Sequence, residues 1–230
     1  MRLNYNMVFG RFIKKINRFI AYVNIEGYSH QVHIMNTGRL GELLVEDAEV
    51  MLSHEPSKAR KTEYDLRMVK KDGIWISIDS QLPNKIVEEG IKLGLVEELK
   101  EYREITRESF YGKSRFDFRL QGKDTCFVEV KGVTLERDGW GYFPDAPTDR
   151  GKKHIEEMIM AVKEGYRGVI MFLIQHPAIN GLSPNKVMDE AFTNKLIFAK
   201  EQGVEILAYG CKVSLEEIII DRKLPVDLYK

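Results

Sequence analysis

Short runs of alternating apolar and polar residues fill the first part of the chain. Alternation with a period of two is typical of half-buried strands. It predicts strands at residues 6–16, 19–25, 28–34, 62–69 and 74–78, with a further strand within 43–45 or 49–52. Lys71-Asp72-Gly73 separates the last two of the five as a hairpin turn. Closely spaced short strands of this kind indicate a small all-β barrel.

Helical and strand patterns alternate in the rest of the chain. Ile86, Val87, Ile91 and Leu95 recur at helical spacing, and Gly94 marks the expected end of that helix. Strands are predicted at residues 115–121, 125–133, 168–174 and 204–213, and helices at residues 150–164 and 184–201. This order predicts an α/β layer arrangement. We therefore expect two domains, a barrel over residues 1–81 and an α/β domain over residues 82–230.

The hairpin at residues 114–131 carries the most informative chemistry. If the apolar faces of both strands enter one core, a three-residue loop at 122–124 pairs Phe118 with Val128. That register sets Asp117 directly opposite Glu129, with Cβ atoms about 5 Å apart. Two carboxylates at this separation can hold one Mg²⁺ or Mn²⁺, which takes oxygen ligands and keeps several waters.

Lys131 lies on the same strand face as Glu129. There it could stabilise developing charge or orient an attacking water, so Asp117, Glu129 and Lys131 are the candidate catalytic residues of a metal-assisted phosphodiester cleavage. The same three side chains also fit a solvated strand face with a cross-strand ion pair. The pattern alone leaves both interpretations open.

Four longer segments add a resemblance. They read HIMNTGR at residues 33–39, YGKSRFD at 111–117, VEVKGVTL at 128–135 and FPDAPTDRGKKH at 143–154. In this order they resemble the motifs of the SfsA, or sugar fermentation stimulation, family. The resemblance implies an N-terminal OB-like barrel, a C-terminal domain similar to PD-(D/E)XK nucleases, and DNA binding without evident sequence preference. Gly132 departs from the family pattern. That pattern leads us to expect Asn at the position after Lys131.

Nuclease cores of this type often draw a third carboxylate from a preceding helix. Glu101, Glu104 and Glu108 are the candidates in this chain. Glu108 lies next to the second motif, so it is the predicted third metal ligand beside Asp117 and Glu129. A surface acid is the alternative.

The chain carries 35 basic and 35 acidic residues, so any DNA surface must be a local patch. The candidate DNA contacts are Arg11, Lys14, Arg18, Arg39, Lys58, Arg60 and Lys61 in the barrel region, and Arg150, Lys152 and Lys153 at the start of a helix. Phosphate could dock at that helix N-terminus, for which Thr148 or Asp149 is the expected cap. Solvated cations are the alternative in both places, and the choice between single- and double-stranded DNA stays open.

The cysteines and the apolar segments of the sequence narrow the class of protein. Cys126 and Cys211 lie in apolar strand-like runs and are expected to be buried thiols. No segment approaches the roughly 20 apolar residues that span a bilayer, which favours a cytoplasmic protein without a membrane partner. We expect a DNA-binding protein with a metal-dependent nuclease site. The alternatives are a non-enzymatic DNA-binding regulator on a nuclease scaffold and a barrel whose aromatic residues stack on sugars.

Overall fold

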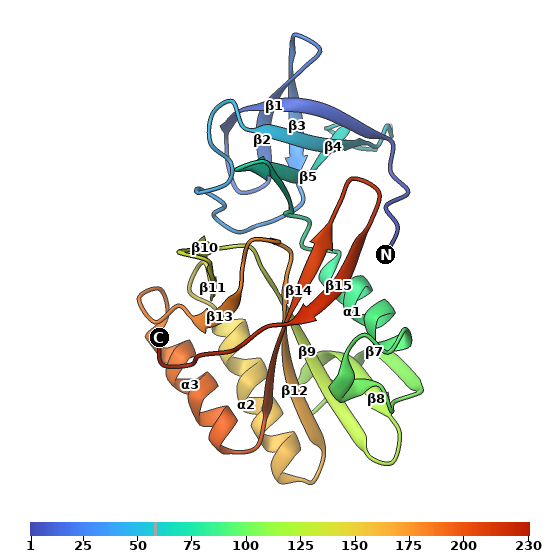
Figure 1. The fold of residues 1–230 in the computed structure, drawn as a ribbon, viewed down its shortest axis with the longest axis vertical. Coiled ribbons are helices and arrows are strands. Elements are labelled where there is room, and N and C mark those ends of the chain that lie inside the picture. The colour runs from blue at the N-terminus through green and yellow to red at the C-terminus, as the bar shows by residue number, and fades with distance from the viewer. Residues whose placement is uncertain (58) are drawn as a thin grey trace.

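The computed structural model describes residues 1–57 and 59–230. Lys58, one of the predicted DNA contacts, lies outside the described residues. A β-rich unit forms one end of the molecule and a larger sheet with helices on both sides forms the other (Figure 1). None of the described helices has the length and apolarity needed to cross a membrane.

The N-terminal unit is a closed barrel. Its strands are β1 (Met7–Lys15), β2 (Ile20–Ile25), β3 (Tyr28–Ile34), β4 (Glu49–His54), β5 (Tyr64–Lys71) and β6 (Ile74–Ser77). Five of them pair in the order β3-β2-β1-β4-β5, and parallel pairing of β3 with β5 closes the ring. The predicted OB-like barrel is therefore confirmed. Residues 43–45 form no strand, since Leu43 and Leu44 lie in a turn that places both side chains in the barrel core.

The second unit is built on a mixed sheet in the order β15-β14-β12-β9-β8-β7. Its strands are β7 (Glu104–Tyr111), β8 (Ser114–Gln121), β9 (Thr125–Val133), β12 (Arg167–Ile174), β14 (Glu205–Val213) and β15 (Ile218–Lys223). Strands β9, β12 and β14 run parallel. The uninterrupted apolar sequence of β12 suits a parallel strand that is covered on both faces.

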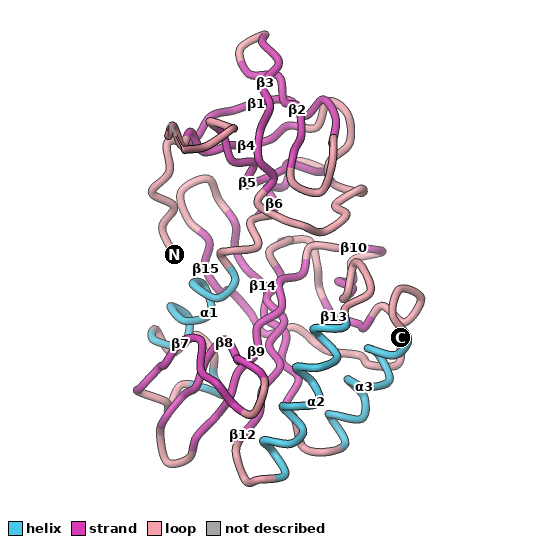
Figure 2. Tube along the Cα trace, turned by 180° about the vertical axis from the view of Figure 1, so that it is seen from behind, coloured by secondary structure: helices cyan, strands magenta, loops and turns pink. Residues whose placement is uncertain are grey.

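Helices cover both faces of this sheet, as the α/β prediction requires. Helix α1 (Pro83–Lys92) packs on one face, and α2 (Asp149–Lys163) and α3 (Glu190–Glu201) pack side by side on the other (Figure 2). A short 3₁₀ turn (Glu97–Leu99) follows α1. A small sheet of β10 (Glu136–Arg137), β11 (Trp140–Phe143) and β13 (Gly181–Pro184) lies beside the ends of the helices.

Two element predictions were wrong. The helix expected at residues 184–201 begins only at Glu190, capped by the Asp189 carboxylate, because residues 181–184 pair with β11 as a strand. Residues 104–111, which hold two of the acids expected on a helix, form the edge strand β7. Both cysteines are free and buried, as predicted.

The β8–β9 hairpin has the predicted register only in part. Phe118 pairs with Val128, as expected from the three-residue loop. The expectation of a single core is wrong, because Phe118 and Leu120 pack under α1 whereas Phe116 packs on the opposite side under α2. Strand β8 therefore crosses between the two layers at Asp117.

Candidate active site

Asp117 lies where the regular pairing of β8 and β9 ends. Beyond the pair of Phe118 and Val128, its carboxylate takes over the role of a strand partner. Oδ2 accepts a hydrogen bond from the Val130 amide at 2.7 Å, and Oδ1 accepts one from Asn84 Nδ2 at 2.6 Å. Asp117 is thus brought to the Glu129 strand, but through its side chain and not as the regular cross-strand pair that we predicted.

Glu129 is almost completely buried, with 4% of its surface exposed. Oε1 accepts hydrogen bonds from Lys131 Nζ at 2.5 Å and from His154 Nδ1. Oε2 is buried as well, and no hydrogen-bond donor among the described residues reaches it. One oxygen of this carboxylate is therefore saturated and the other is bare.

The pKa values of the two acids shift in opposite directions from their ordinary values. Burial raises the pKa of Asp117, and the nearby negative charge of Glu129 raises it further. Burial also acts to raise the pKa of Glu129, but the hydrogen bonds and charges of His154 and Lys131 outweigh it, so the pKa lies below its ordinary value. The surroundings therefore favour the ionised form of Glu129 and disfavour that of Asp117.

Two residues that the sequence analysis did not assign to the site position this pair from opposite helices. Asn84 sits in the first turn of α1, which opens with Pro83. His154 sits in the second turn of α2, whose first turn is held by Thr148 Oγ1 accepting from the Gly151 amide at 3.0 Å. His154 is the last residue of the fourth motif, and this position was the sequence feature that could have assigned it to the site. No sequence feature pointed to Asn84.

The predicted third carboxylate does not join the pair. Glu108 faces Asp117 in the register of β7 and β8, between the pairs Arg107–Phe118 and Ser109–Phe116. Its backbone is left-handed, with a φ of 53°, and its half-exposed side chain forms an ion pair with Arg115 at 2.7 Å. No group of three or more His, Cys, Asp or Glu side chains able to hold a metal exists among the described residues.

Several predicted DNA contacts are engaged by acids. Arg60 binds the buried Asp65, and Lys152 binds Asp149 at 2.9 Å and the buried Asp189 at 3.6 Å. These ion pairs tie both cations to neighbouring acids of the fold.

Two more of the predicted cations make contacts that are exposed to solvent. Arg11 pairs with Asp47 at 3.1 Å on the exposed surface. Lys153 Nζ donates to the Lys113 carbonyl at 3.4 Å.

The other predicted cations remain exposed without an ion pair to any described residue. They are Lys14, Arg18, Arg39, Lys61 and Arg150. Arg18 lies over the ring of Phe19, 4.8 Å from its centroid, and Phe19 is itself 41% exposed. Phe12, by contrast, is part of the barrel core.

Comparison with known proteins agrees with this architecture. Residues 13–78 match the SfsA N-terminal OB domain, and residues 81–217 match the sugar fermentation stimulation protein RE domain. The sugar fermentation stimulation protein homolog of Caldanaerobacter subterraneus subsp. tengcongensis is 47% identical over 95% of this chain and 96% of its own. That of Thermoanaerobacter sp. strain X514 is 47% identical over 96% of this chain and 97% of its own.

A solved structure extends the agreement to three dimensions. Pyrococcus furiosus SfsA, determined in complex with Ca²⁺, superposes with a TM-score of 0.89 at 32% identity, over 99% of this chain and 98% of that one. Both domains and most of the chain's length are included in these matches. The chain belongs to the sugar fermentation stimulation protein (SfsA) family.

Proposed function

We propose that this protein is a DNA-binding, divalent-metal-dependent nuclease whose site is built on Asp117 and Glu129. The observation that carries the proposal is the bare Oε2 of Glu129, buried beside a second carboxylate. A buried carboxylate oxygen without a donor is costly unless a cation completes it. A hard divalent ion between the two acids would remove that cost.

The donor set fits Mg²⁺ or Mn²⁺. Both take carboxylate oxygens, and Mg²⁺ is commonly held by only one or two carboxylates together with water and phosphate. The Ca²⁺ complex of the Pyrococcus furiosus relative supports a hard-cation site in this fold. When bound, the ion would supply Lewis-acid activation of the phosphodiester and a water of lowered pKa.

The surrounding residues have distinct tasks in this proposal. Asn84 and the Val130 amide orient the Asp117 carboxylate. His154 holds Glu129 from the opposite helix, which fixes the rotamer that leaves Oε2 free. Lys131 contacts Glu129 from the same strand, so it would stabilise charge that develops on the phosphate or help orient water.

DNA would be held by the exposed cations that have no acidic partner among the described residues. Arg18 and Arg39 lie together on the barrel, and Arg150 lies at the start of α2. Phosphate contacts by such residues are independent of sequence and weaken steeply with salt.

The direct test is cleavage of labelled single- and double-stranded DNA in EDTA, Mg²⁺ or Mn²⁺, with metal binding followed separately by calorimetry. Glu129→Gln keeps the size of the side chain but removes its charge, and should abolish both metal binding and cleavage. Glu108→Gln is the matched control, because Glu108 is paired with Arg115 on the surface. Metal binding that survives Glu129→Gln would refute the assignment of the site.

One observation favours a second candidate. Lys131 and His154 already saturate one oxygen of Glu129, as in a structural ion-pair cluster. This suits a non-enzymatic DNA-binding regulator on a nuclease scaffold. DNA binding without cleavage under every metal condition, unchanged in Glu129→Gln, would favour that candidate.

A further inference from the structure

A cleft of about 320 Å³ lies between the barrel and the sheet domain. The barrel side contributes residues 36–38 and 77–80, and the sheet domain contributes residues 132–135 and 142–148 together with Gln175. The first and fourth motifs meet at this cleft, where Asp145 Oδ2 accepts a hydrogen bond from the Arg39 amide at 3.1 Å. A Cβ at Gly38 would clash with Asp145 Oδ2, so a side chain there would displace this carboxylate.

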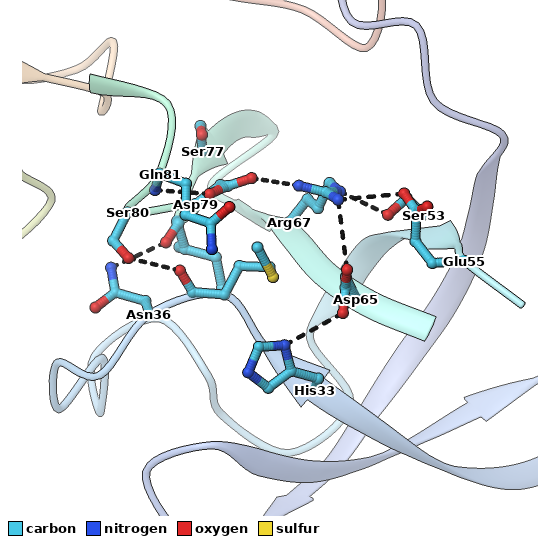
Figure 3. Close-up of polar contacts among 12 residues, drawn as sticks. His33, Asn36, Ser53, Glu55, Asp65, Arg67, Ser77, Asp79, Ser80 and Gln81 are labelled. Atoms are coloured by element: carbon cyan, nitrogen blue, oxygen red, sulfur yellow. Dashed lines mark hydrogen bonds and ion pairs between the residues drawn. The ribbon is translucent and has the colours of Figure 1, made fainter. Parts of the chain in front are cut away.

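The described residues that line the cleft include no Lys, Arg or His. Its two acids are already engaged, Asp145 by the Arg39 amide and Asp79 by the buried Arg67, toward which its carboxylate turns (Figure 3). Apart from these two acids the lining is neutral: hydroxyl and amide groups, prolines, and the rings of Tyr142 and Phe143. A phosphate would lose its hydration here without gaining a cation. A flat, neutral ring with a hydrogen-bonding edge suits the lining, and the volume is near the lower limit of about 300 Å³ for small-molecule pockets.

Gln175 gives the cleft a specific polar group. The residue is 2% exposed, and its Nε2 donates to Ser77 Oγ at 2.6 Å and faces the carbonyl oxygens of Ser77 and Asp79. Because carbonyl oxygens can only accept, the NH₂ group must lie on that side. Oε1 therefore points the other way, and no described residue donates to it in the hydrogen bonds of the structure. A ligand with an amino group would satisfy it.

Two pairs of consecutive residues connect the cleft to the carboxylates. Pro83 lines the cleft, and the next residue, Asn84, holds Asp117. Gly132 lines the cleft, and the preceding Lys131 contacts Glu129. Since consecutive Cα atoms are about 3.8 Å apart, the backbone segments that line the cleft also carry the residues that hold the two acids.

We infer that the cleft binds one unpaired nucleobase of the DNA, turned out of the stack, next to the phosphodiester at the Asp117–Glu129 pair. The inference rests on the proposed function, which it deepens by naming the substrate: DNA with an extrudable base. Enzymes that extrude a base pay the cost of unstacking it, and that cost is smallest at mismatched or unpaired positions. Adenine, cytosine and guanine carry an exocyclic amino donor for Gln175 Oε1, and thymine does not.

Gly132 controls the room for such a base. A Cβ at this position would lie 3.0 Å from Pro83 Cγ and 3.7 Å from Gln175 Oε1, so a longer side chain would occupy the cleft. Asn, which the family resemblance leads us to expect here, is a natural filling variant. Gly41 provides a matched control, because nothing lies within 4 Å of a Cβ at that position.

The test uses a duplex with 2-aminopurine at a mismatch, whose fluorescence rises when the base leaves the stack. Measurements in EDTA keep the strand intact, and anisotropy of a second label reports binding separately. We expect a several-fold rise in fluorescence with the wild-type protein and with Gly41→Asn, and the level of free duplex with Gly132→Asn at equal saturation. The same rise with Gly132→Asn, or bound DNA without any rise in the wild type, would overturn the inference and leave the nuclease proposal standing. No DNA binding at all would overturn both.

A second measurement needs no variant. Deoxyadenosine at millimolar concentration should raise the Tm of the wild-type protein more than thymidine does, because adenine carries an exocyclic amino group for Gln175 Oε1 and thymine carries none. Equal shifts by the two nucleosides, or no shift by either, would count against the inference. Stabilisation by glucose alone would assign the cleft to a saccharide and overturn it.

Discussion

Two of the buried charge clusters, one in each domain, differ in how completely their polar atoms are satisfied. In the barrel, Arg67 is 7% exposed and donates to Ser53 Oγ at 2.6 Å, to Asp79 and to Asp65 (Figure 3). Its guanidinium also lies 3.8 Å from the centroid of the Tyr5 ring. In the sheet domain, Glu129 has one saturated oxygen and one that is bare.

The degree to which a buried cluster is satisfied distinguishes a structural role from a ligand-binding role. A fully connected buried network fixes one conformation and leaves nothing for a ligand to complete. An incomplete one costs stability and persists where a ligand completes it. The barrel cluster therefore anchors the end of β6 and the segment that leads to α1, whereas the carboxylate pair is the proposed cation site.

The largest effect is expected from breaking the satisfied cluster. Arg67→Met keeps much of the side-chain volume but leaves the completely buried Asp79 without its cation. Removal of one partner of a buried ion pair costs about 3–5 kcal/mol. We expect a loss of that size in the free energy of unfolding, measured by urea denaturation.

The control for this variant is Arg119→Met, which changes an exposed arginine on β8. It should alter the free energy of unfolding by no more than about 0.5 kcal/mol. If both variants lose equally little, the barrel cluster is not the anchor that its geometry indicates.

The incomplete cluster should respond in the opposite way. Asp117→Asn removes a charge whose pKa burial and Glu129 both raise, and Asn84 can turn its amide to present an acceptor to the new NH₂ group. Without metal, the variant should be as stable as the wild type or slightly more stable. With metal at 100 times its Kd, the wild type should gain about 2.7 kcal/mol and the variant nothing.

Thermal or urea unfolding in EDTA and in saturating Mn²⁺ measures both quantities. A variant that loses several kcal/mol in EDTA would show that Asp117 is a structural acid like Asp79. A variant that keeps the metal-dependent gain would exclude Asp117 as a ligand.

The sequence predicted those features of the two clusters' surroundings that depend on the local pattern of apolar and polar residues. Alternation gave the barrel strands, and matching faces gave the register of Phe118 with Val128. The candidate acids lay next to that pair, so Asp117 and Glu129 were found together. The crossing of β8 between two layers was missed, because Phe116 and Phe118 have the same apolar character although they enter different cores.

The rest of the site depends on contacts between distant segments. The polar residue that α1 contributes is the amide of Asn84, not a glutamate, and nothing in the local sequence distinguishes it from an ordinary helix-start residue. Glu108 had the right position in the chain, but its side chain is held by Arg115. Whether a cation is free also depends on tertiary partners, as Lys152 shows by its pairing with Asp189.

His176 is a second incompletely satisfied buried group. Neither ring nitrogen has a hydrogen-bond partner among the described residues. Burial lowers its pKa below the ordinary value, so the folded protein keeps the ring neutral. The unfolded chain binds the proton with a pKa of about 6.5. Stability from this group is therefore complete above that pH and is lost as the pH falls from there toward the folded pKa, by up to about 1.4 kcal/mol per pH unit.

The measurement is the free energy of unfolding between neutral pH and pH 5 for the wild type, His176→Phe and His30→Phe. The difference between the wild type and His176→Phe should change over this interval, in the direction that favours the variant at low pH. His30 lies in the barrel strand β3 and serves as the control for removing a histidine. Identical pH dependence in all three proteins would mean that His176 finds a partner in solution.

The smallest effect concerns exposed arginines, and it applies the same distinction to the surface. Arg11 is paired with Asp47 at 3.1 Å, whereas Arg18 has no acidic partner among the described residues and lies over Phe19. A cation that contacts phosphate adds about 0.9 to the slope of log K against log salt for duplex DNA. Arg18→Ala should therefore lower the slope by nearly one and weaken binding alike for different sequences, while Arg11→Ala should lower it less, because the acid already neutralises that charge. Anisotropy titrations at several salt concentrations measure both slopes, and equal losses would show that a surface ion pair with Asp47 does not withhold Arg11 from DNA.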